Sequence, residues 1–228
     1  MLYRPHKYNT YSAFGDFFYQ KKYFWIIIFF ILISPISSSE KQDYFNWIRI
    51  QHDLKNTNQI VHKIEFQELL KKNIPNKSYY FGSTNKNKKE TVLEAFSKVL
   101  SGPPNKIIFQ GNDNRYIILS ACRQHSCDEK GFLWIDTEKK ILTGIIIHYF
   151  FDDAPYDKRG YAFMFTNRPA KFVGQPDEFS TEVKNWTENT SKVIPSVIRF
   201  LNSKGDLEII NNSYYKDKHD EFIKQLRK

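Results

Sequence analysis

Two cysteines and a histidine lie close together in the middle of the chain, within the stretch Ser120–Asp128 (SACRQHSCD). Cys122 and Cys127 are the only cysteines among 228 residues, and His125 lies between them. Thiolates and imidazoles bind zinc, thiol pairs carry out redox exchange, and paired cysteines form disulfides. The local pattern therefore allows three kinds of chemistry: a metal site, a redox switch or a cross-linked loop.

Metal binding and redox catalysis are the less favoured of the three. A structural zinc site needs four protein ligands, and the loop offers only three candidates on one tight turn. A fourth ligand would have to come from a distant residue such as His148 or Asp152. A redox pair is typically C-x-x-C beside a βαβ unit, whereas the spacing here is wider and the context is a run of strands. We therefore expect no metal ligand and no cofactor.

Hydrolytic chemistry is not indicated either. Ser120 and His125 could form a nucleophile–base pair, but no carboxylate at a recognisable spacing would orient the histidine. Asp152 and Asp153 are equally compatible with a turn. We expect no catalytic residues and hence a binding protein rather than an enzyme. His125 could also be an exposed residue with no role, and His148, inside an apolar segment, is expected to be buried.

Residues 1–39 have the layout of an export segment. Lys21 and Lys22 precede ten uninterrupted apolar residues, Phe24–Ile33, and small polar residues follow. That apolar run is about half of the ~20 residues that a membrane-spanning helix needs. The pattern predicts a secretory signal cleaved after Ser39, or, as an alternative, an uncleaved N-terminal membrane anchor. Both place the rest of the chain outside the cytosol, where a pair of thiols normally forms a disulfide.

The composition indicates a folded domain and argues against a nucleic-acid partner. Apolar residues make up 41% of the chain and aromatic residues 17%, so a sizeable core is expected. The net charge of +9 is spread along the chain without a run of five basic residues, and we expect no nucleic-acid partner. Around the cysteines the balance reverses, because residues 113–138 hold three basic and five acidic residues, a net of −2.

The pattern of apolar residues predicts an α+β protein. Helical spacing predicts helices over Gln59–Asn73 and Lys88–Leu100. Five segments then read as strands with short connections, which favours an antiparallel meander; they are Lys106–Gln110, Arg115–Ala121, Phe132–Asp136, Leu142–Phe151 and Gly160–Thr166. The cysteine loop falls between two of these strands and is expected at a hairpin tip.

The C-terminal part of the chain is more polar. Beyond Gln175 we expect an extension with helices at Pro195–Leu201 and from Lys216 to the end. The expected organisation is therefore an export segment or anchor over residues 1–39, a folded domain over 40–175 and a polar, helical extension over 176–228.

Around the cysteine loop the sequence resembles the inhibitors of vertebrate lysozyme (Ivy), periplasmic proteins of Gram-negative bacteria. The stretch Tyr116–Cys127 (YIILSACRQHSC) is similar to the family's tyrosine, three variable residues, Ser-Ala and C-K-P-H-D-C. Gly111–Asp113 is similar to its upstream turn, and Leu142–Gly144 to a Thr-Gly on the following strand. The resemblance extends over about residues 65–165 and is most specific over 111–144.

The resemblance implies a fold and a function. The fold is an antiparallel sheet with helices packed on one face, and residues 40–175 would be the Ivy-like domain. The function is inhibition of a lysozyme or related glycan-cleaving enzyme in the periplasm, by a disulfide-held loop that enters the active-site cleft. His125 would bind the catalytic carboxylates, and Cys122 and Cys127 would form the disulfide. The other residues expected to contact the enzyme are Arg123, Gln124, Ser126 and Asp128.

Three positions depart from the family pattern. Arg123-Gln124 replaces Lys-Pro, which keeps the charge and loses the rigid proline, and Ser126 replaces an acidic residue. The alternative function is that of an exported or anchored scaffold that binds a cell-wall component or a protein partner without inhibiting an enzyme. A homodimer is compatible with both functions, and contact with a membrane is expected only through an uncleaved N-terminal segment.

Overall fold

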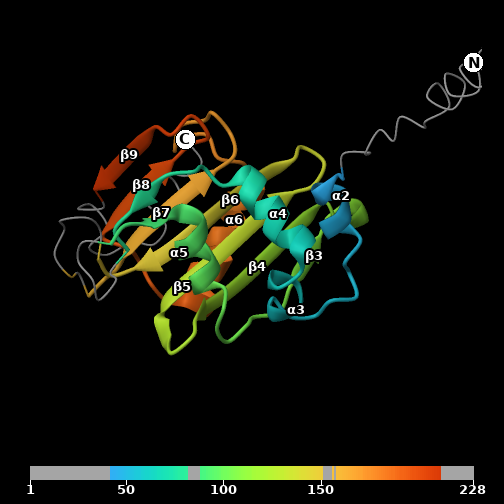
Figure 1. Ribbon diagram of the computed structural model, residues 1–228, viewed down its shortest axis with the longest axis horizontal. Coiled ribbons are helices and arrows are strands. Elements are labelled where there is room, and N and C mark those ends of the chain that lie inside the picture. Colours follow the sequence, from blue (N-terminus) through green and yellow to red (C-terminus); the bar gives the residue numbers. More distant parts are fainter. Residues whose placement is uncertain (1–41, 82–87, 151–155, 157, 212–228) are drawn as a thin grey trace, which may run out of the picture. The chain divides into compact units, whose positions relative to one another are not determined.

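A seven-stranded sheet forms the centre of the computed structural model, which describes residues 42–81, 88–150, 156 and 158–211. The strand order is β3-β4-β5-β6-β7-β8-β9 (Figure 1). The strands are β3 (Ile108–Gln110), β4 (Tyr116–Arg123), β5 (Ser126–Asp136), β6 (Ile141–His148), β7 (Tyr161–Thr166), β8 (Val197–Leu201) and β9 (Leu207–Asn211).

Helices and short turns complete the described fold. The helices are α2 (Tyr44–Arg49), α3 (Asn58–Val61), α4 (Ile64–Asn73), α5 (Val92–Val99) and α6 (Asp177–Trp186). A 3₁₀ turn, η1 (Asn112–Asn114), precedes β4, and a π turn, η2 (Thr187–Ser191), follows α6. Two short strands, β1 (Ser78–Tyr79) and β2 (Glu90–Thr91), form a separate antiparallel pair.

The predicted α+β class is confirmed. Strands β3 to β7 are sequential antiparallel neighbours, as expected for a meander. The helix predicted over Gln59–Asn73 is divided into α3 and α4, which are separated at His62 and Lys63. The helix predicted over Lys88–Leu100 begins later, at Val92, because the Thr91 hydroxyl accepts a hydrogen bond from the backbone N–H of Glu94 and caps it.

The predicted helix over Pro195–Leu201 is wrong. Residues Val197–Leu201 form strand β8, which pairs with β7 on one side and with β9 on the other. Its β-branched and aromatic side chains, such as Ile198 and Phe200, suit a pleated strand that is buried on its faces. The segment after residue 175, which was expected to be a polar extension, thus contributes two strands to the same sheet.

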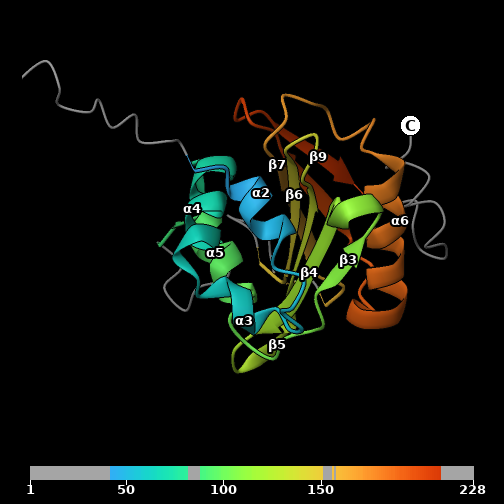
Figure 2. The same cartoon turned by 90° about the vertical axis from the view of Figure 1, so that its right-hand side faces the viewer.

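Helix α6 follows from the direction of β8. Strands β7 and β8 run parallel, and parallel neighbours cannot be joined by a tight hairpin but need a crossover that is usually helical. Residues 167–196 make this crossover and carry α6 across the sheet. Figure 2 shows α6 on the face opposite to the one covered by α2, α3, α4 and α5. Helices therefore cover both faces of the sheet. The expectation that helices pack on one face holds for α2 to α5, which precede the meander, but not for α6.

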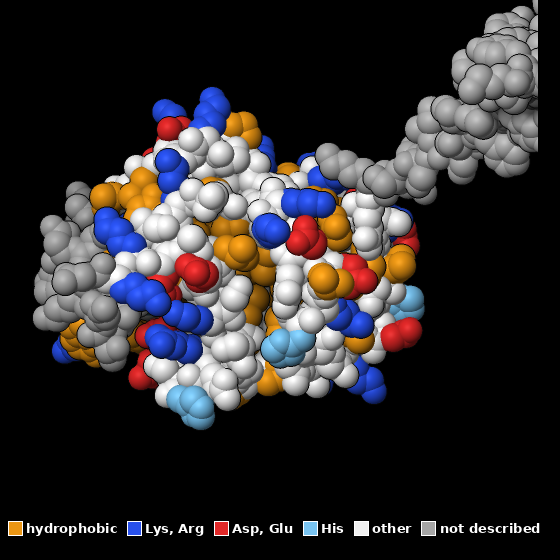
Figure 3. Space-filling model, viewed as in Figure 1, with side chains coloured by type: hydrophobic (Ala, Val, Ile, Leu, Met, Phe, Trp, Pro, Cys, Tyr) orange, Lys and Arg blue, Asp and Glu red, His pale blue; other side chains and the backbone are white. Residues whose placement is uncertain are grey.

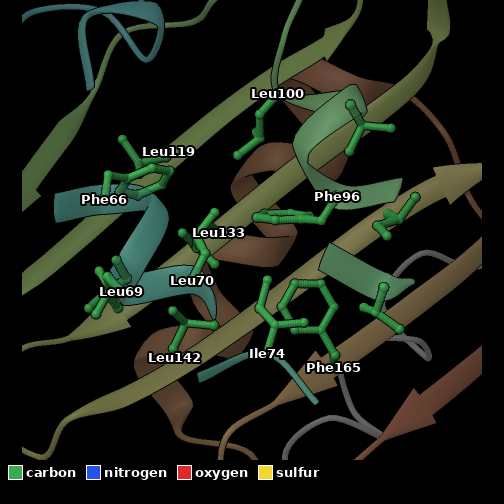
Figure 4. Close-up of a cluster of buried hydrophobic side chains, with 14 of the residues drawn as sticks. Phe66, Leu69, Leu70, Ile74, Phe96, Leu100, Leu119, Leu133, Leu142 and Phe165 are labelled. Atoms are coloured by element: carbon green, nitrogen blue, oxygen red, sulfur yellow. The ribbon is translucent and has the colours of Figure 1, made fainter. Parts of the chain in front are cut away.

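Two apolar clusters fill the space on the two faces of the sheet. Side chains from α2, α4 and α5 pack on alternate residues of the strands, such as Leu119 and Leu133 (Figure 4). The intervening residues, such as Phe132 and Trp134, pack against Phe179 and the rest of α6. Every residue of β6 and β7 is buried in consequence. The alternation of side chains along a strand thus fixes which residues each helix contacts.

Some expectations fall outside the described residues. These are the export segment over residues 1–39, the aspartates Asp152 and Asp153, and the helix expected from Lys216 onward. Among the helices of the described part, none has the length and apolar character needed to cross a membrane.

His148 is buried beside the apolar cluster that α2, α4 and α5 cover, with 1% of its surface exposed. Its sequence context predicted this burial. Its ring packs edge-on against Phe81, with 5.1 Å between ring centroids. Burial, reinforced by the positive charge of Arg199, lowers the pKa of His148 from 6.5 to about 3, although a hydrogen bond with the backbone of Phe150 acts in the opposite direction. The imidazole is therefore neutral in the folded protein at neutral pH.

This burial predicts a loss of stability in mild acid. Between pH 6.5 and about 5 the unfolded chain protonates His148 while the folded chain does not, so the free energy of unfolding falls as pH falls, by up to about 1.4 kcal/mol per pH unit. His148→Gln should flatten this slope, and His62→Gln, at an exposed position, should leave it unchanged. Urea unfolding measured across this pH range checks both; equal slopes in the wild type and His148→Gln would contradict the assignment.

Candidate functional site

The cysteine stretch lies at the tip of the hairpin formed by β4 and β5, at the lower left of Figure 1. Gln124 and His125 are the two turn residues between the paired Arg123 and Ser126, and the side chains of both turn residues are exposed. His125 has a φ of +63°, in the left-handed region, where histidine is one of the few residues besides glycine that occurs with some frequency. The turn thus presents an imidazole to solvent, as the sequence predicted.

Below the turn, the strand pairing is interrupted by a bulge. Pairing runs without a break from Tyr116–Asp136 to Cys122–Lys130, and the next pair is Arg123–Ser126. Three residues of β5, Cys127 to Glu129, therefore have no counterpart on β4. A bulge of this kind bends and twists the hairpin, so the tip leaves the direction of the sheet.

Two cross-links hold the bulge. Cys122 and Cys127 form the disulfide that the sequence predicted. Arg123 Nη1 lies 2.8 Å from Glu129 Oε2, and these side chains are 36% and 17% exposed. Lys130 Nζ also donates a hydrogen bond to the carbonyl of Cys127. The turn between these links has little freedom to change shape.

The ion pair changes the role expected for Arg123. The sequence placed Arg123 among the residues that contact a partner, whereas the structure engages its guanidinium with Glu129. Glu129 was not expected to be its partner, because nothing local in the sequence shows that a bulge turns this carboxylate back toward the arginine. The expected contact residues Gln124, Asp128 and His125 are exposed, and Ser126 is half-buried.

The segment Gly102–Asn105 supports the base of the tip. Gly102 N–H donates to the carbonyl of Cys122 at 2.9 Å, and Cys122 N–H donates to the carbonyl of Pro103 at 3.4 Å. Asn105 N–H donates to the carbonyl of Ser120 at 3.0 Å, so the segment lies alongside β4. The contact of Gly102 with the loop was not predicted from the sequence.

Position 102 has no room for a side chain. A Cβ at this position would lie 2.5 Å from the Cys122 carbonyl oxygen, 2.6 Å from the Gln124 nitrogen and 2.7 Å from the Arg123 carbonyl carbon. All three are backbone atoms, which cannot move aside as the end of a flexible side chain can. The segment can therefore approach the cysteine loop this closely only with glycine.

Beside the tip lies a hollow of about 330 Å³ between the hairpin, α5 and the buried His148. Its charged side chains form ion pairs: Lys98 Nζ lies 2.7 Å from Glu90 Oε1, and Arg123 pairs with Glu129. These pairs leave little net charge next to His125.

Aromatic rings flank the bulge on the side of β6. Burial raises the pKa of the Tyr149 phenol, and the negative charge of Asp128 nearby raises it further. The ring of Tyr149 stacks on that of Tyr156, and Phe150 packs against the same ring, with 5.4 Å between the ring centroids of Phe150 and Tyr156. Tyr156 is 60% exposed, so the tip stands beside accessible aromatic surface.

The structure also locates residues that the sequence offered for other chemistry. No group of three or more potential metal ligands occurs among the described residues. Ser120 is buried, and its hydroxyl accepts a hydrogen bond from Asn105 Nδ2 at 2.9 Å, whereas His125 is exposed at the tip. The structure thus does not bring the two together as nucleophile and base.

A further concavity lies on the face that α4 and α5 cover. Figure 3 shows hydrophobic side chains gathered in a hollow on this face, and the space between the two helices measures about 600 Å³. Phe66, Leu70 and Leu93 line it, with charged residues around the edge. It contains none of the residues that the sequence singled out.

No protein-family model, no curated protein and no solved structure matches this chain. The resemblance over Tyr116–Cys127 therefore rests on the sequence of those residues alone.

The position of Gly102 generates a prediction. Gly102→Ala should displace the backbone of residues 122–124 and destabilise the fold by about 1–3 kcal/mol, the usual cost of overpacking. Amide NMR shifts of Gln124 and His125 and the unfolding midpoint measure the two effects. Ser101→Ala, at the exposed neighbouring position, should change stability by no more than about 0.5 kcal/mol. Unchanged amide shifts at the tip in Gly102→Ala would show that the segment does not support the loop.

Proposed function

We propose that the protein inhibits a lysozyme or a related glycan-cleaving enzyme by placing the β4–β5 tip in the active-site cleft. The observation that carries the proposal is His125, an exposed imidazole held at a two-residue turn by a disulfide and an ion pair. A loop that is already ordered loses little conformational entropy on binding, so more of its contact energy remains as affinity.

The chemistry of the imidazole suits such a cleft. Glycosidases of this kind carry two carboxyl groups, one of which is kept protonated as the general acid. An imidazole between them can donate a hydrogen bond to one group and accept one from the other, or it can carry a proton and pair with both. His125 would occupy the space that the substrate needs, and the protein would perform no catalysis itself.

The surroundings of the tip add contact area. Gln124 and Asp128 are exposed beside His125, and the exposed ring of Tyr156 stacks on Tyr149, whose phenol is near the charge of Asp128. Aromatic side chains are enriched where proteins bind one another, and the charged pairs near the tip satisfy each other. The predicted export segment fits this function, because a disulfide and a periplasmic or extracellular target belong to the same compartment.

The first test is inhibition by the purified, oxidised protein of a panel of lysozymes and lytic transglycosylases acting on cell walls. Micromolar protein should inhibit at least one of them. His125→Asn, which removes the imidazole but tolerates a positive φ, should weaken inhibition by about 5- to 150-fold, equivalent to about 1–3 kcal/mol.

Two comparisons make this test specific. Gln124→Ala should cost less than His125→Asn, because Gln124 is expected at the edge of the contact, and His62→Ala should cost nothing. The melting temperature of each variant should be close to that of the wild type, since all three positions are exposed. If the protein inhibits no enzyme of the panel, the proposal fails and a binding protein without inhibitory activity is left; full inhibition by His125→Asn would exclude the occluding histidine.

The disulfide generates a separate prediction. The double variant Cys122→Ser, Cys127→Ser opens a very short loop, so the free energy of unfolding should fall by only about 2 kcal/mol in the chain-entropy account. Affinity for the target enzyme should fall as well, because the turn must then be ordered on binding. Calorimetry of unfolding and of binding separates the two effects, and an undiminished affinity would mean that the Arg123–Glu129 pair and the backbone alone shape the tip.

A further inference from the structure

A pocket of about 370 Å³ lies on the other face of the sheet, between strands β3 to β5 and the end of α6. In Figure 2, α6 runs beside β3 and β4 on the side opposite to α2–α5. The volume falls within the range of about 300–1,000 Å³ that is usual for small-ligand sites. None of residues 122–127 lines it, so it is separate from the β4–β5 tip.

The surface of α6 that lines the pocket is largely polar. Phe179 and Val183 pack on the sheet, but the positions that line the pocket are Glu182, Asn185 and Asn189. Glu182 and Asn185 are three residues apart in α6 and therefore share one face of the helix. After Trp186 the helix widens into the π turn η2, which supplies Asn189, and such turns occur frequently at functional sites.

The floor of the pocket is apolar and its edge carries hydrogen-bonding groups. Phe132 and Ile118 of the sheet and Trp186 of α6 lie at the floor, all of them buried. Glu182 is only 9% exposed, and its carboxylate accepts a hydrogen bond from Gln110 Nε2 at 3.2 Å. This bond fixes the carboxylate in place and uses one of its several acceptor positions.

We propose that this pocket binds a neutral saccharide. An amide side chain offers a donor and an acceptor from one planar group, which is what neighbouring sugar hydroxyls or an acetamido group require. The apolar floor suits the C–H face of a pyranose ring. Lys106 and Glu182 are the charged residues that line the pocket, and their opposite charges favour an uncharged ligand over an anion or a cation.

The test uses N,N′,N″-triacetylchitotriose as the probe and the intact oxidised protein. Saturable binding is expected by calorimetry and by a change in tryptophan fluorescence, because Trp186 lies in the pocket. The double variant Asn185→Ala, Asn189→Ala should weaken binding by about tenfold or more, and Glu182→Gln should weaken it to a smaller degree because the amide retains an acceptor. Asn58→Ala, an exposed asparagine on α3, serves as the matched control and should bind as the wild type does.

Each result decides the proposal. Absence of binding by the chitotriose and by neutral oligomers of glucose, mannose and galactose at millimolar concentration would overturn it. Equal binding by the wild type and the Asn185/Asn189 double variant would place the saccharide elsewhere and would also overturn it, as would binding of short neutral peptides in preference to sugars. The assay contains no lysozyme, and its outcome is therefore independent of the inhibitor proposal.

Discussion

The pairing of β4 with β5 is the constraint on which the candidate site depends. The pairing begins at Tyr116 and Asp136, where Arg115 makes two hydrogen bonds to the buried Asp136 carboxylate at 3.2 and 2.9 Å. Burial by itself raises the pKa of Asp136, but Arg115 and the backbone N–H groups of the following turn outweigh it and lower the pKa below its usual value. One hairpin thus extends from a buried ion pair to an exposed turn.

The same hairpin connects the packed core to the exposed tip. Helix α5 approaches β5 so closely at Gly131 that a Cβ there would lie 2.7 Å from Val99 Cγ2. The chain then leaves α5 and returns along β4 as the segment Gly102–Asn105. Because helix, segment and both strands belong to one packed unit, a change in the direction of the hairpin would disturb the apolar core. The imidazole at the tip is consequently positioned by contacts well below it.

Sequence patterns located the elements of the site best where the determinant is local, although β5 begins at Ser126, six residues before the predicted Phe132. The alternation of apolar residues in β4 and β5, the polar stretch between them and the two nearby cysteines placed the hairpin and its disulfide. The strand β8 was missed because its parallel partner β7 lies some 30 residues earlier in the chain, and a short apolar run does not distinguish a strand from a helix. Glu129 and Gly102 were missed for a related reason: the bulge and the close approach of two backbones leave no periodic signal.

The charge of the chain constrains how the proposed inhibitor would act. Residues 1–39 carry four basic residues and one acidic residue, so removal of the predicted signal would lower the net charge from +9 to +6. Animal lysozymes are basic too, and like charges slow the encounter of two proteins. Ion pairing of Arg123 and Lys98 with carboxylates keeps positive charge away from His125 at short range, but it does not remove the long-range repulsion. Tight inhibition of a basic lysozyme would therefore have to come from slow dissociation, which a prearranged tip favours, whereas a less basic glycan-cleaving enzyme would also associate quickly.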